Sequence, residues 1–186
     1  MGLKNIQEEF VKLSLDNKTR EKSFESDSKV SNPFAHLKLA INRHAFSLMR
    51  KRLGVVKSIL RNTRMFLGEK FDKEFIQYAR GSEVPSGIDR HRKDAIQFAD
   101  WLIRLNQSSK YSPYLDVLLS HELQSVHMWM RKKRFGLKFY WRSPHRMIFL
   151  CRNSLSLKKA RISPTIVIWM ETKSGHSCYK WVSFSI

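Results

Sequence analysis

Cysteine is nearly absent from this sequence. Cys151 and Cys178 are the only two in 186 residues, and they do not form a C-x-x-C pair. Two thiols are too few for a disulfide-stapled scaffold, and their spacing excludes a redox or zinc motif built on paired cysteines. Both lie in apolar runs that are typical of strands, so we expect them to be buried, reduced and structural.

Glycine and long apolar runs are also scarce. The seven glycines form no P-loop, no dinucleotide-binding turn and no nucleophile elbow. Serines, histidines and acids lack the spacing of a catalytic motif, so we predict no catalytic residue in this chain. No apolar stretch approaches the roughly 20 residues of a membrane span. The N-terminus, MGLKNIQEEF, has acids where a secretory signal would be apolar, so we expect a cytoplasmic protein with no membrane partner.

Acidic residues are the third shortage. The chain has sixteen Asp and Glu but 35 Lys and Arg, which gives a net charge of +19. The excess is uneven, because residues 131–186 hold thirteen Lys and Arg and one acid, a net +12, whereas residues 1–130 hold 22 and 15, a net +7. Such a surface favours polyanions, acidic peptides or an acidic partner subunit.

Residues 1–134 show helical periodicity and predict a helical domain. The expected segments are a short helix from residue 3 to 13, a polar linker or loop at 16–32, a long helical pattern at 34–67, a short helix at 71–78, and helices at 89–105 and from Pro113 onward. We expect the long pattern to break, if anywhere, near Asn42 or Gly54, and to end at Gly68.

Two apolar stripes run along the long helix. The first falls at alternating steps of three and four and comprises Phe46, Met49, Leu53, Val56, Leu60, Thr63 and Leu67. A second stripe beside it, which runs from Leu48 to Phe66, includes one charge, Arg52. Such spacing places each stripe on one face of a helix, and we expect the first to be buried along its whole length.

After residue 134 the pattern changes to short runs rich in β-branched and aromatic residues. The runs are LKFYWR at 137–142, RMIFLCR at 146–152, PTIVIWME at 164–171 and CYKWVSFSI at 178–186. Turn-prone segments separate them, so we predict about four strands of a small antiparallel meander over 135–186. The predicted fold class is α+β, with an N-terminal helical bundle followed by this sheet, which should pack on the helices because so small a sheet is marginal alone.

The stretch HELQSVHMWM, residues 121–130, invites comparison with a metalloprotease helix. A zincin requires His-Glu-x-x-His, so that two histidines four residues apart share a helix face. Here His121 and His127 are six apart, about 240° round a helix, and Ser125 occupies the fourth position. We therefore predict no metal site in this chain.

Glu122 lies in the apolar stripe of the same helix. An unpaired carboxylate in that position would cost several kcal/mol, so it should have a partner. Arg52 is the cation that we expect to pair with it. We interpret this pair as a structural ion pair between two helices rather than as a catalytic group.

One side of the long helix carries a row of cations opposite its apolar stripes. The row comprises Arg43, Arg50, Lys57, Arg61 and Arg64, with Gly54 among them. It has three possible readings: a track for phosphates with steep salt dependence, an ordinary solvated face, or a docking surface for an acidic protein. No helix-turn-helix, RNA-binding consensus or zinc finger accompanies it.

Three helical segments, in order, carry a family resemblance. RKRLGVVKSILRNTRMFLGEKFDKEFIQYA at 50–79, DAIQFADWL at 94–102 and SPYLDVLLSHE at 112–122 resemble the helical half of MbnC-like partner proteins of methanobactin biosynthesis. The resemblance covers roughly residues 46–130 as a series in order. Asn62 stands where we expect a proline in that family, and the C-terminal strands match only in kind.

This resemblance implies a helical domain followed by a small β domain with no active site of its own. Such proteins pair with a TIM-barrel enzyme that carries several iron ions and oxidises cysteine in a ribosomally made peptide, so the iron would belong to the partner and no cofactor to this chain. Relatives of the helical domain are labelled DNA-binding modules. A DNA- or RNA-binding module that uses Arg50, Lys57, Arg61 and Arg64 is therefore the alternative.

The function that we predict is a non-catalytic accessory subunit that binds a precursor (leader) peptide and docks on an iron-dependent oxidase. A small antiparallel sheet exposes an edge to which an extended peptide can add a strand, and the +12 region would attract an acidic one. We expect CYKWVSFSI to be that edge. The predicted contact residues are Arg131, Lys132, Lys133 and Arg134 at the junction, and Tyr179, Trp181 and Ser183 on one face of the last strand.

Overall fold

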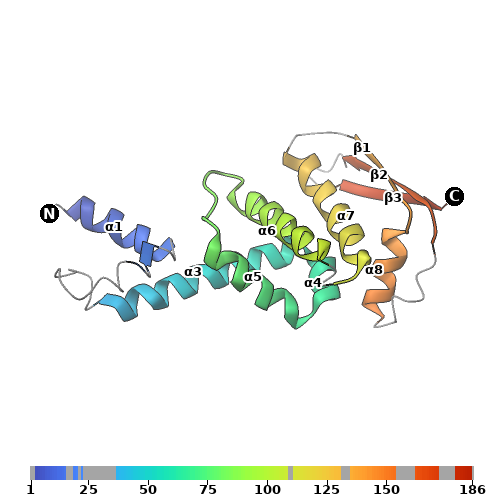
Figure 1. Cartoon of the computed structure of the whole chain (residues 1–186). Helices are drawn as coiled ribbons and strands as arrows, with labels where there is room; N and C mark the ends of the chain where they lie inside the picture. The colour runs from blue at the N-terminus through green and yellow to red at the C-terminus, as the bar shows by residue number, and fades with distance from the viewer. Residues whose placement is uncertain are drawn as a thin grey trace.

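The computed structural model describes residues 3–15, 19–20, 22, 37–108, 111–130, 135–153, 162–171 and 179–185. Within them the elements follow in this order: α1 (Leu3–Leu15), α3 (Lys38–Ile59), α4 (Arg61–Leu67), α5 (Glu69–Gly81), α6 (Arg90–Gln107), α7 (Pro113–Met130), β1 (Phe135–Tyr140), α8 (Pro144–Arg152), β2 (Thr165–Glu171) and β3 (Tyr179–Ser185). The molecule is elongated: α1 and the start of α3 form one end and the sheet forms the other (Figure 1).

The main core lies between α3, α4, α5, α6 and α7. Its centre is aromatic, because Phe98 of α6 meets Phe71 and Phe75 of α5 edge-on, with ring centroids 5.2 and 5.1 Å apart. Aromatic pairs in this geometry add to the free energy gained from burial. Leucines of α6 and α7 complete the cluster, so α3 to α7 share one continuous interior.

The apolar stripe predicted for the long helix is confirmed over most of its length. Five of its members are buried, namely Leu53, Val56, Leu60, Thr63 and Leu67. Met49 is half-buried, and Phe46 is exposed, because the first half of α3 extends beyond the bundle and leaves this ring 55% exposed. Gly68 follows α4 with φ of 57°, a left-handed conformation that suits glycine, so this predicted helix end is also confirmed.

The long helical pattern is interrupted at Leu60, not near Asn42 or Gly54. Leu60 has φ −100° and ψ 53°, and α4 begins at the next residue. The carboxylate of Glu122 on α7 accepts hydrogen bonds from the backbone N–H groups of Asn62 and Thr63 at 2.6 and 3.0 Å, and from Thr63 Oγ1 at 2.6 Å. An acid from another helix therefore satisfies N–H groups that the start of α4 leaves without a helical partner.

The α+β class is confirmed, but one of the four predicted strands is wrong. Residues 146–152 lie in helix α8, and the described sheet has three strands in the order β1-β2-β3, both pairs antiparallel. Ser143 caps α8 by accepting a hydrogen bond from Arg146 N at 3.4 Å, and Pro144 occupies the first turn, where it costs no hydrogen bond. The helix buries Met147, Ile148 and Leu150 against Leu118 of α7.

Small hydrophobic clusters join each end of the molecule to the neighbouring helix. Leu13 of α1 packs on Ile41 of α3, and the Phe10 ring lies 5.6 Å from that of His44. At the other end the sheet rests on α7 through Met128, Tyr140, Val167 and Trp169. None of the helices in the described ranges is both long and apolar enough to cross a membrane.

Candidate functional site

The inner face of the sheet is tied closely to α7. Val167 and Trp169 of β2 are fully buried there with Tyr140 of β1. Gly136 permits this approach, because a Cβ at that position would overlap Met128 Sδ and lie 3.2 Å from Gln124 Nε2. The alternation of β strands then turns the neighbouring residues, Phe135 and Leu137, to the opposite face.

The outer face of the sheet is apolar and exposed. Phe135, Leu137 and Phe139 of β1 are 56, 57 and 43% exposed. Their partners across the antiparallel ladder are Met170, Ile168 and Ile166 of β2, respectively. Directly opposite side chains in such a pair lie close together, so these six residues form one apolar surface of three cross-strand pairs. We call this surface the outer face.

Two further residues extend the outer face beyond the end of β1. The Trp141 ring lies 5.1 Å from that of Phe139 in an edge-on arrangement, and Trp141 is largely exposed. The backbone N–H of Ser163 donates to the carbonyl of Trp141 at 3.2 Å, which holds the segment containing the exposed Ile162 beside it.

An antiparallel sheet with one face on the core usually presents polar residues on the other face. Here both faces of the β1–β2 pair are apolar, and no helix in the described part of the chain covers the outer one; α8 packs instead against α4 and α7. A contiguous apolar patch on a soluble surface marks a site that another molecule covers. The outer face is therefore the candidate functional site.

The strand β1 is also an edge of the described sheet. Its register with β2 runs without a bulge from Phe135↔Met170 to Tyr140↔Thr165. Edge strands are commonly protected by charges, prolines or bulges. β1 has no proline and no bulge in its described register, and Lys138 is its one charged residue, so the edge lies beside an apolar face with a single cation in the strand.

Cations lie on the α7 side of β1 and on α8. Lys138 donates to Ser120 Oγ at 2.6 Å, the Arg142 guanidinium lies 5.0 Å from the centroid of the Tyr114 ring, and Arg146 and Arg152 are exposed on α8. Glu171 is the single acid in residues 131–186. This excess of cations in the same part of the chain favours a partner that carries negative charge beside its apolar surface.

Two titratable groups lie behind the sheet. The His121 ring of α7 is 5.3 Å from that of Trp169 and 6.4 Å from that of Tyr140. Burial, with a smaller contribution from His145, lowers the pKa of His121 to about 4, and burial raises the pKa of Tyr140 to about 12. Both groups are therefore neutral near pH 7, and neither is tuned for proton transfer there.

The predicted contact residues are placed only in part. Arg131 to Arg134 lie outside the described residues. On β3, which is an edge of the described sheet as expected, backbone register sets Tyr179 opposite Glu171, Trp181 opposite Trp169 and Ser183 opposite Val167. The side chains of β3 are outside the described part, so their role in binding stays a prediction.

The predicted ion pair between Arg52 and Glu122 is wrong. Glu122 is buried and has partners, as expected, but these belong to α4. Arg52 instead makes a bidentate pair with Asp94 of α6, with Nε to Oδ2 at 3.0 Å and Nη2 to Oδ1 at 2.8 Å. The hydroxyl of Tyr78 on α5 donates to the same carboxylate at 2.9 Å, so three helices meet at one buried acid.

The basic row of the alternative reading is not a uniform cationic surface. Lys57 is paired with Asp72 at 2.6 Å, whereas Arg43, Arg50, Arg61 and Arg64 are exposed. Lys57, Arg61 and Arg64 border a depression of about 570 Å³, but Glu69 and Asp72 border it as well. These two acids weaken the attraction of that depression for phosphates.

Potential metal ligands do not gather in the described ranges, where no group of three or more His, Cys, Asp or Glu side chains is placed to hold an ion. Of the two histidines of the HELQSVH stretch, His121 is buried and His127 is half-buried.

The outer face itself was not predicted from the sequence. A signal for it was present in FGLKFYW, residues 135–141, where every second residue is large and apolar. Comparison with known proteins adds no relative: no family model matches the chain, and no curated protein matches it.

Proposed function

We propose that this chain is a non-catalytic accessory subunit of a cytoplasmic enzyme complex. It binds a ribosomally made precursor peptide and docks on an iron-dependent TIM-barrel oxidase that modifies cysteines of that peptide. The observation that supports a binding role is the apolar outer face, which adjoins the edge strand β1. The identity of the enzyme rests on the resemblance of residues 46–130 to MbnC-like partner proteins.

The peptide is assigned to the β1 edge. An extended segment that adds a strand there gains main-chain hydrogen bonds, and its alternate side chains continue the apolar row of Leu137 and Phe139. The preferred peptide has acidic residues between its apolar ones, because the cations Lys138 and Arg142 lie near this strand.

The oxidase is assigned to the outer face. A folded partner with an apolar centre and an acidic rim would cover the three cross-strand pairs together with Trp141 and Ile162. A second copy of this chain is a poorer occupant, since two molecules of +19 each repel one another. The iron and its ligands would lie in the partner.

Nucleic-acid binding through Arg50, Lys57, Arg61 and Arg64 is the competing function. The pairing of Lys57 with Asp72, and the presence of Glu69 beside Arg61 and Arg64, argue against it. Non-specific attraction of DNA to so basic a chain is expected in any case, and it should disappear as salt rises.

The test uses defined probes on the full chain. A fluorescein-labelled ten-residue peptide of alternating Glu and Val should bind, as measured by anisotropy, more than tenfold better than its Lys–Val counterpart. Methylation of its backbone nitrogens should abolish binding, because an added strand depends on main-chain hydrogen bonds. Equal binding of the methylated peptide would show attraction by charge alone.

Matched variants locate the binding surface. Leu137→Asp should abolish peptide binding, whereas Phe149→Asp should preserve it, because Phe149 is 56% exposed on α8 and lies outside the sheet. A 20-base-pair duplex is titrated in parallel at 50 and 200 mM salt. Nanomolar affinity that persists at the higher salt would support the nucleic-acid function instead.

The genes beside this one provide the cognate test. If these genes encode a TIM-barrel oxidase and a short cysteine-containing peptide, both are co-expressed with this chain. The mass of the peptide should then change only when this chain is present. Peptide modification that does not require this chain contradicts the accessory role.

A further inference from the structure

The first half of α3 projects beyond the helical bundle and carries both apolar and basic side chains on one side (Figure 1). Leu39, Arg43, Phe46 and Arg50 follow one another at steps of four, three and four residues, which places them on one face of the helix. All four are exposed, Leu39 by 62% and Phe46 by 55%. The Arg50 guanidinium lies 5.7 Å from the centroid of the Phe46 ring, so cations and apolar groups adjoin. We call these four residues the α3 face.

The α3 face continues a stripe that is buried farther along the same helix. Leu53, seven residues after Phe46, belongs to the main core. Helix α1 does not cover the exposed part, because it packs on Ile41 and His44, which the helical period places on the opposite side of α3. The stripe is therefore core at one end and open at the other.

A depression lies beside the α3 face and extends its apolar surface. Phe46 and Met49 border the depression on α3, and Ile76 and Ala79 border it on α5. Its volume is about 570 Å³. A concave apolar surface next to a helix suits the side chains of a second helix laid along it, whereas a flat bilayer would reach only the projecting residues.

The charges of α3 are all positive. Residues 38–59 contain six Lys and Arg and no Asp or Glu. Arg52 and Lys57 are paired with acids of α6 and α5, whereas neither Arg43 nor Arg50 forms an ion pair with any residue that the structure describes. Two such cations beside an apolar row favour a partner that carries acids next to its own apolar side chains.

We infer that the α3 face binds an acidic amphipathic helix of a partner protein. The apolar side chains of that helix pack on Leu39 and Phe46 and enter the depression, and its carboxylates pair with Arg43 and Arg50 through charge-assisted hydrogen bonds. The phosphates of a nucleic acid would engage the arginines but leave the two apolar side chains in water, so a protein helix is the better occupant. The α3 face lies far from the outer face in Figure 1, and the inference does not depend on the function proposed above.

The probes are three fluorescein-labelled peptides of about eighteen residues, titrated with the full chain at about 150 mM salt and followed by anisotropy. The first has leucines at alternating steps of three and four, with glutamates and alanines between them, so that one face of its helix is apolar. The second has the same composition in scrambled order, and the third has lysine in place of glutamate. The first should bind as one equivalent and about tenfold more tightly than the scrambled peptide, and the lysine peptide should not bind.

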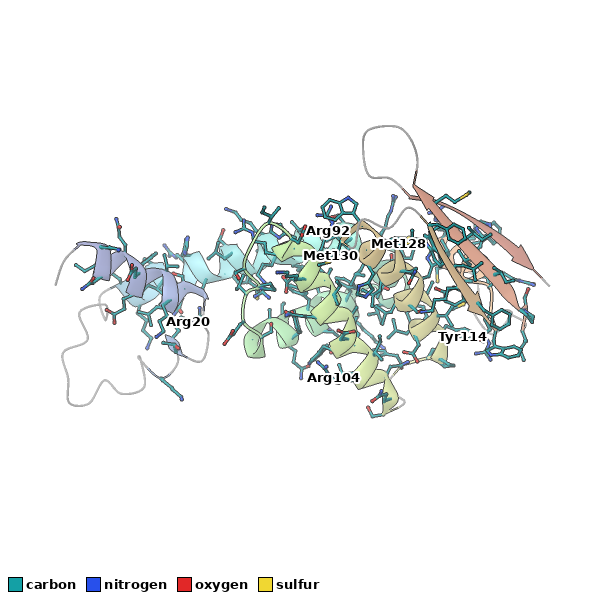
Figure 2. All side chains as sticks on the ribbon, turned by 90° about the horizontal axis from the view of Figure 1, so that it is seen from above. Arg20, Arg92, Arg104, Tyr114, Met128 and Met130 are labelled. Carbon is teal, nitrogen blue, oxygen red and sulfur yellow. The ribbon has the colours of Figure 1, made fainter. Side chains whose placement is uncertain are left out.

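Matched variants locate the binding on α3. Phe46→Ser should weaken binding of the first peptide about tenfold, whereas Leu137→Ser, at a residue of similar exposure on the outer face, should change it less than about twofold. Arg50→Gln should weaken it about fivefold and Arg104→Gln less than about twofold, because Arg104 is an exposed cation of α6 that lies well apart from the first half of α3 in Figure 2. Phe46→Ser should keep the urea midpoint of the parent chain, since the ring is more than half exposed.

Hydrogen exchange provides a second readout. Binding of the first peptide should slow amide exchange in residues 38–50 and leave the exchange of β1 unchanged. Equal binding of the scrambled peptide, equal losses of affinity in Phe46→Ser and Leu137→Ser, or no binding of the first peptide would each overturn the proposal. Phosphatidylglycerol vesicles and a DNA duplex are titrated in parallel. Binding of either that depends on Phe46 would assign the α3 face to a membrane or to nucleic acid instead.

Discussion

The Glu122 carboxylate of α7 accepts two hydrogen bonds from Thr63 of α4, one from its backbone N–H at 3.0 Å and one from its Oγ1 at 2.6 Å. Burial raises the pKa of Glu122, while the hydrogen bonds from Thr63 and Asn62 act in the opposite direction. The interaction joins residues that are 59 positions apart in the sequence, and it fixes where the long helical pattern breaks.

Removal of this carboxylate should destabilise the protein. Glu122→Ala leaves two N–H groups and a hydroxyl without an acceptor, so the free energy of unfolding should fall by about 2–4 kcal/mol. The midpoint of urea unfolding measures this loss of stability. Glu83→Ala, at an exposed loop position, is the control and should leave the midpoint unchanged. An unchanged midpoint for Glu122→Ala would show that the contact contributes nothing.

The pair of Arg52 and Asp94 should be strongly coupled. Both side chains are nearly buried, so Arg52→Met alone leaves the Asp94 carboxylate without its cation. This variant should lower the free energy of unfolding by about 3–5 kcal/mol. The double variant with Asp94→Leu should recover part of that loss in a double-mutant cycle. Lys57→Met breaks the more exposed pair with Asp72 and should cost less than about 1 kcal/mol. Equal losses of unfolding free energy in Arg52→Met and Lys57→Met would contradict this ranking.

His121 should make stability depend on pH. Its pKa of about 4 in the folded chain lies below the ordinary 6.5, so between these values the unfolded chain binds a proton that the folded chain does not. The free energy of unfolding should therefore fall as pH drops from 6.5 to 4, by on the order of 3 kcal/mol in total, and this contribution is absent above pH 6.5.

The comparison of variants isolates that contribution. His121→Gln should flatten the decline over this window, whereas His44→Gln, at an exposed position on α3, should keep it. The pH dependence that Glu122 contributes has the opposite sign. Because the pKa of Glu122 is raised in the folded chain, its contribution to the free energy of unfolding declines as pH rises through that pKa. The difference between parent and variant, measured by urea unfolding at each pH, removes that overlap.

Two glycines should respond in opposite directions to substitution by alanine. At Gly136 a Cβ meets Met128 Sδ and Gln124 Nε2, so the Met128 side chain must shift and Gly136→Ala should destabilise the protein by up to about 1 kcal/mol, the low end of overpacking costs, because these atoms belong to flexible side chains. At Gly54, inside α3, a Cβ meets no atom within 4 Å, so Gly54→Ala should stabilise it by about 0.5–1 kcal/mol. Thermal unfolding distinguishes the two, and shifts of the same sign would contradict this reading.

The sequence predicted features that depend on local periodicity. The stripe through Leu53, Val56 and Leu60 and the helix end at Gly68 follow from residue type and spacing alone, and both are found in the structure. The break at Leu60 could not be predicted in this way, because its cause is an acid on α7 that is distant in the sequence. The choice between Asp94 and Glu122 as the partner of Arg52 likewise depends on which helices become neighbours.

The C-terminal part shows a different limit. A short apolar run such as RMIFLCR suits a strand or a buried helix equally well, and the Ser143–Pro144 start signal, which favours a helix, was the information that could have decided it. The alternation of Phe135, Leu137 and Phe139 predicts a strand, but which of its faces remains exposed depends on where α7 and α8 pack.

The outer face also bears on how the purified chain behaves in solution. Mutual repulsion at +19 should oppose stacking of such apolar sheets between molecules, and it acts over about 10 Å in 0.1 M salt but only about 3 Å in 1 M salt. Concentrated salt should thus bring on clustering of the isolated chain, while dilute buffer preserves it as single molecules. We therefore expect surface charge, rather than a polar sheet face, to provide the colloidal stability of the isolated chain.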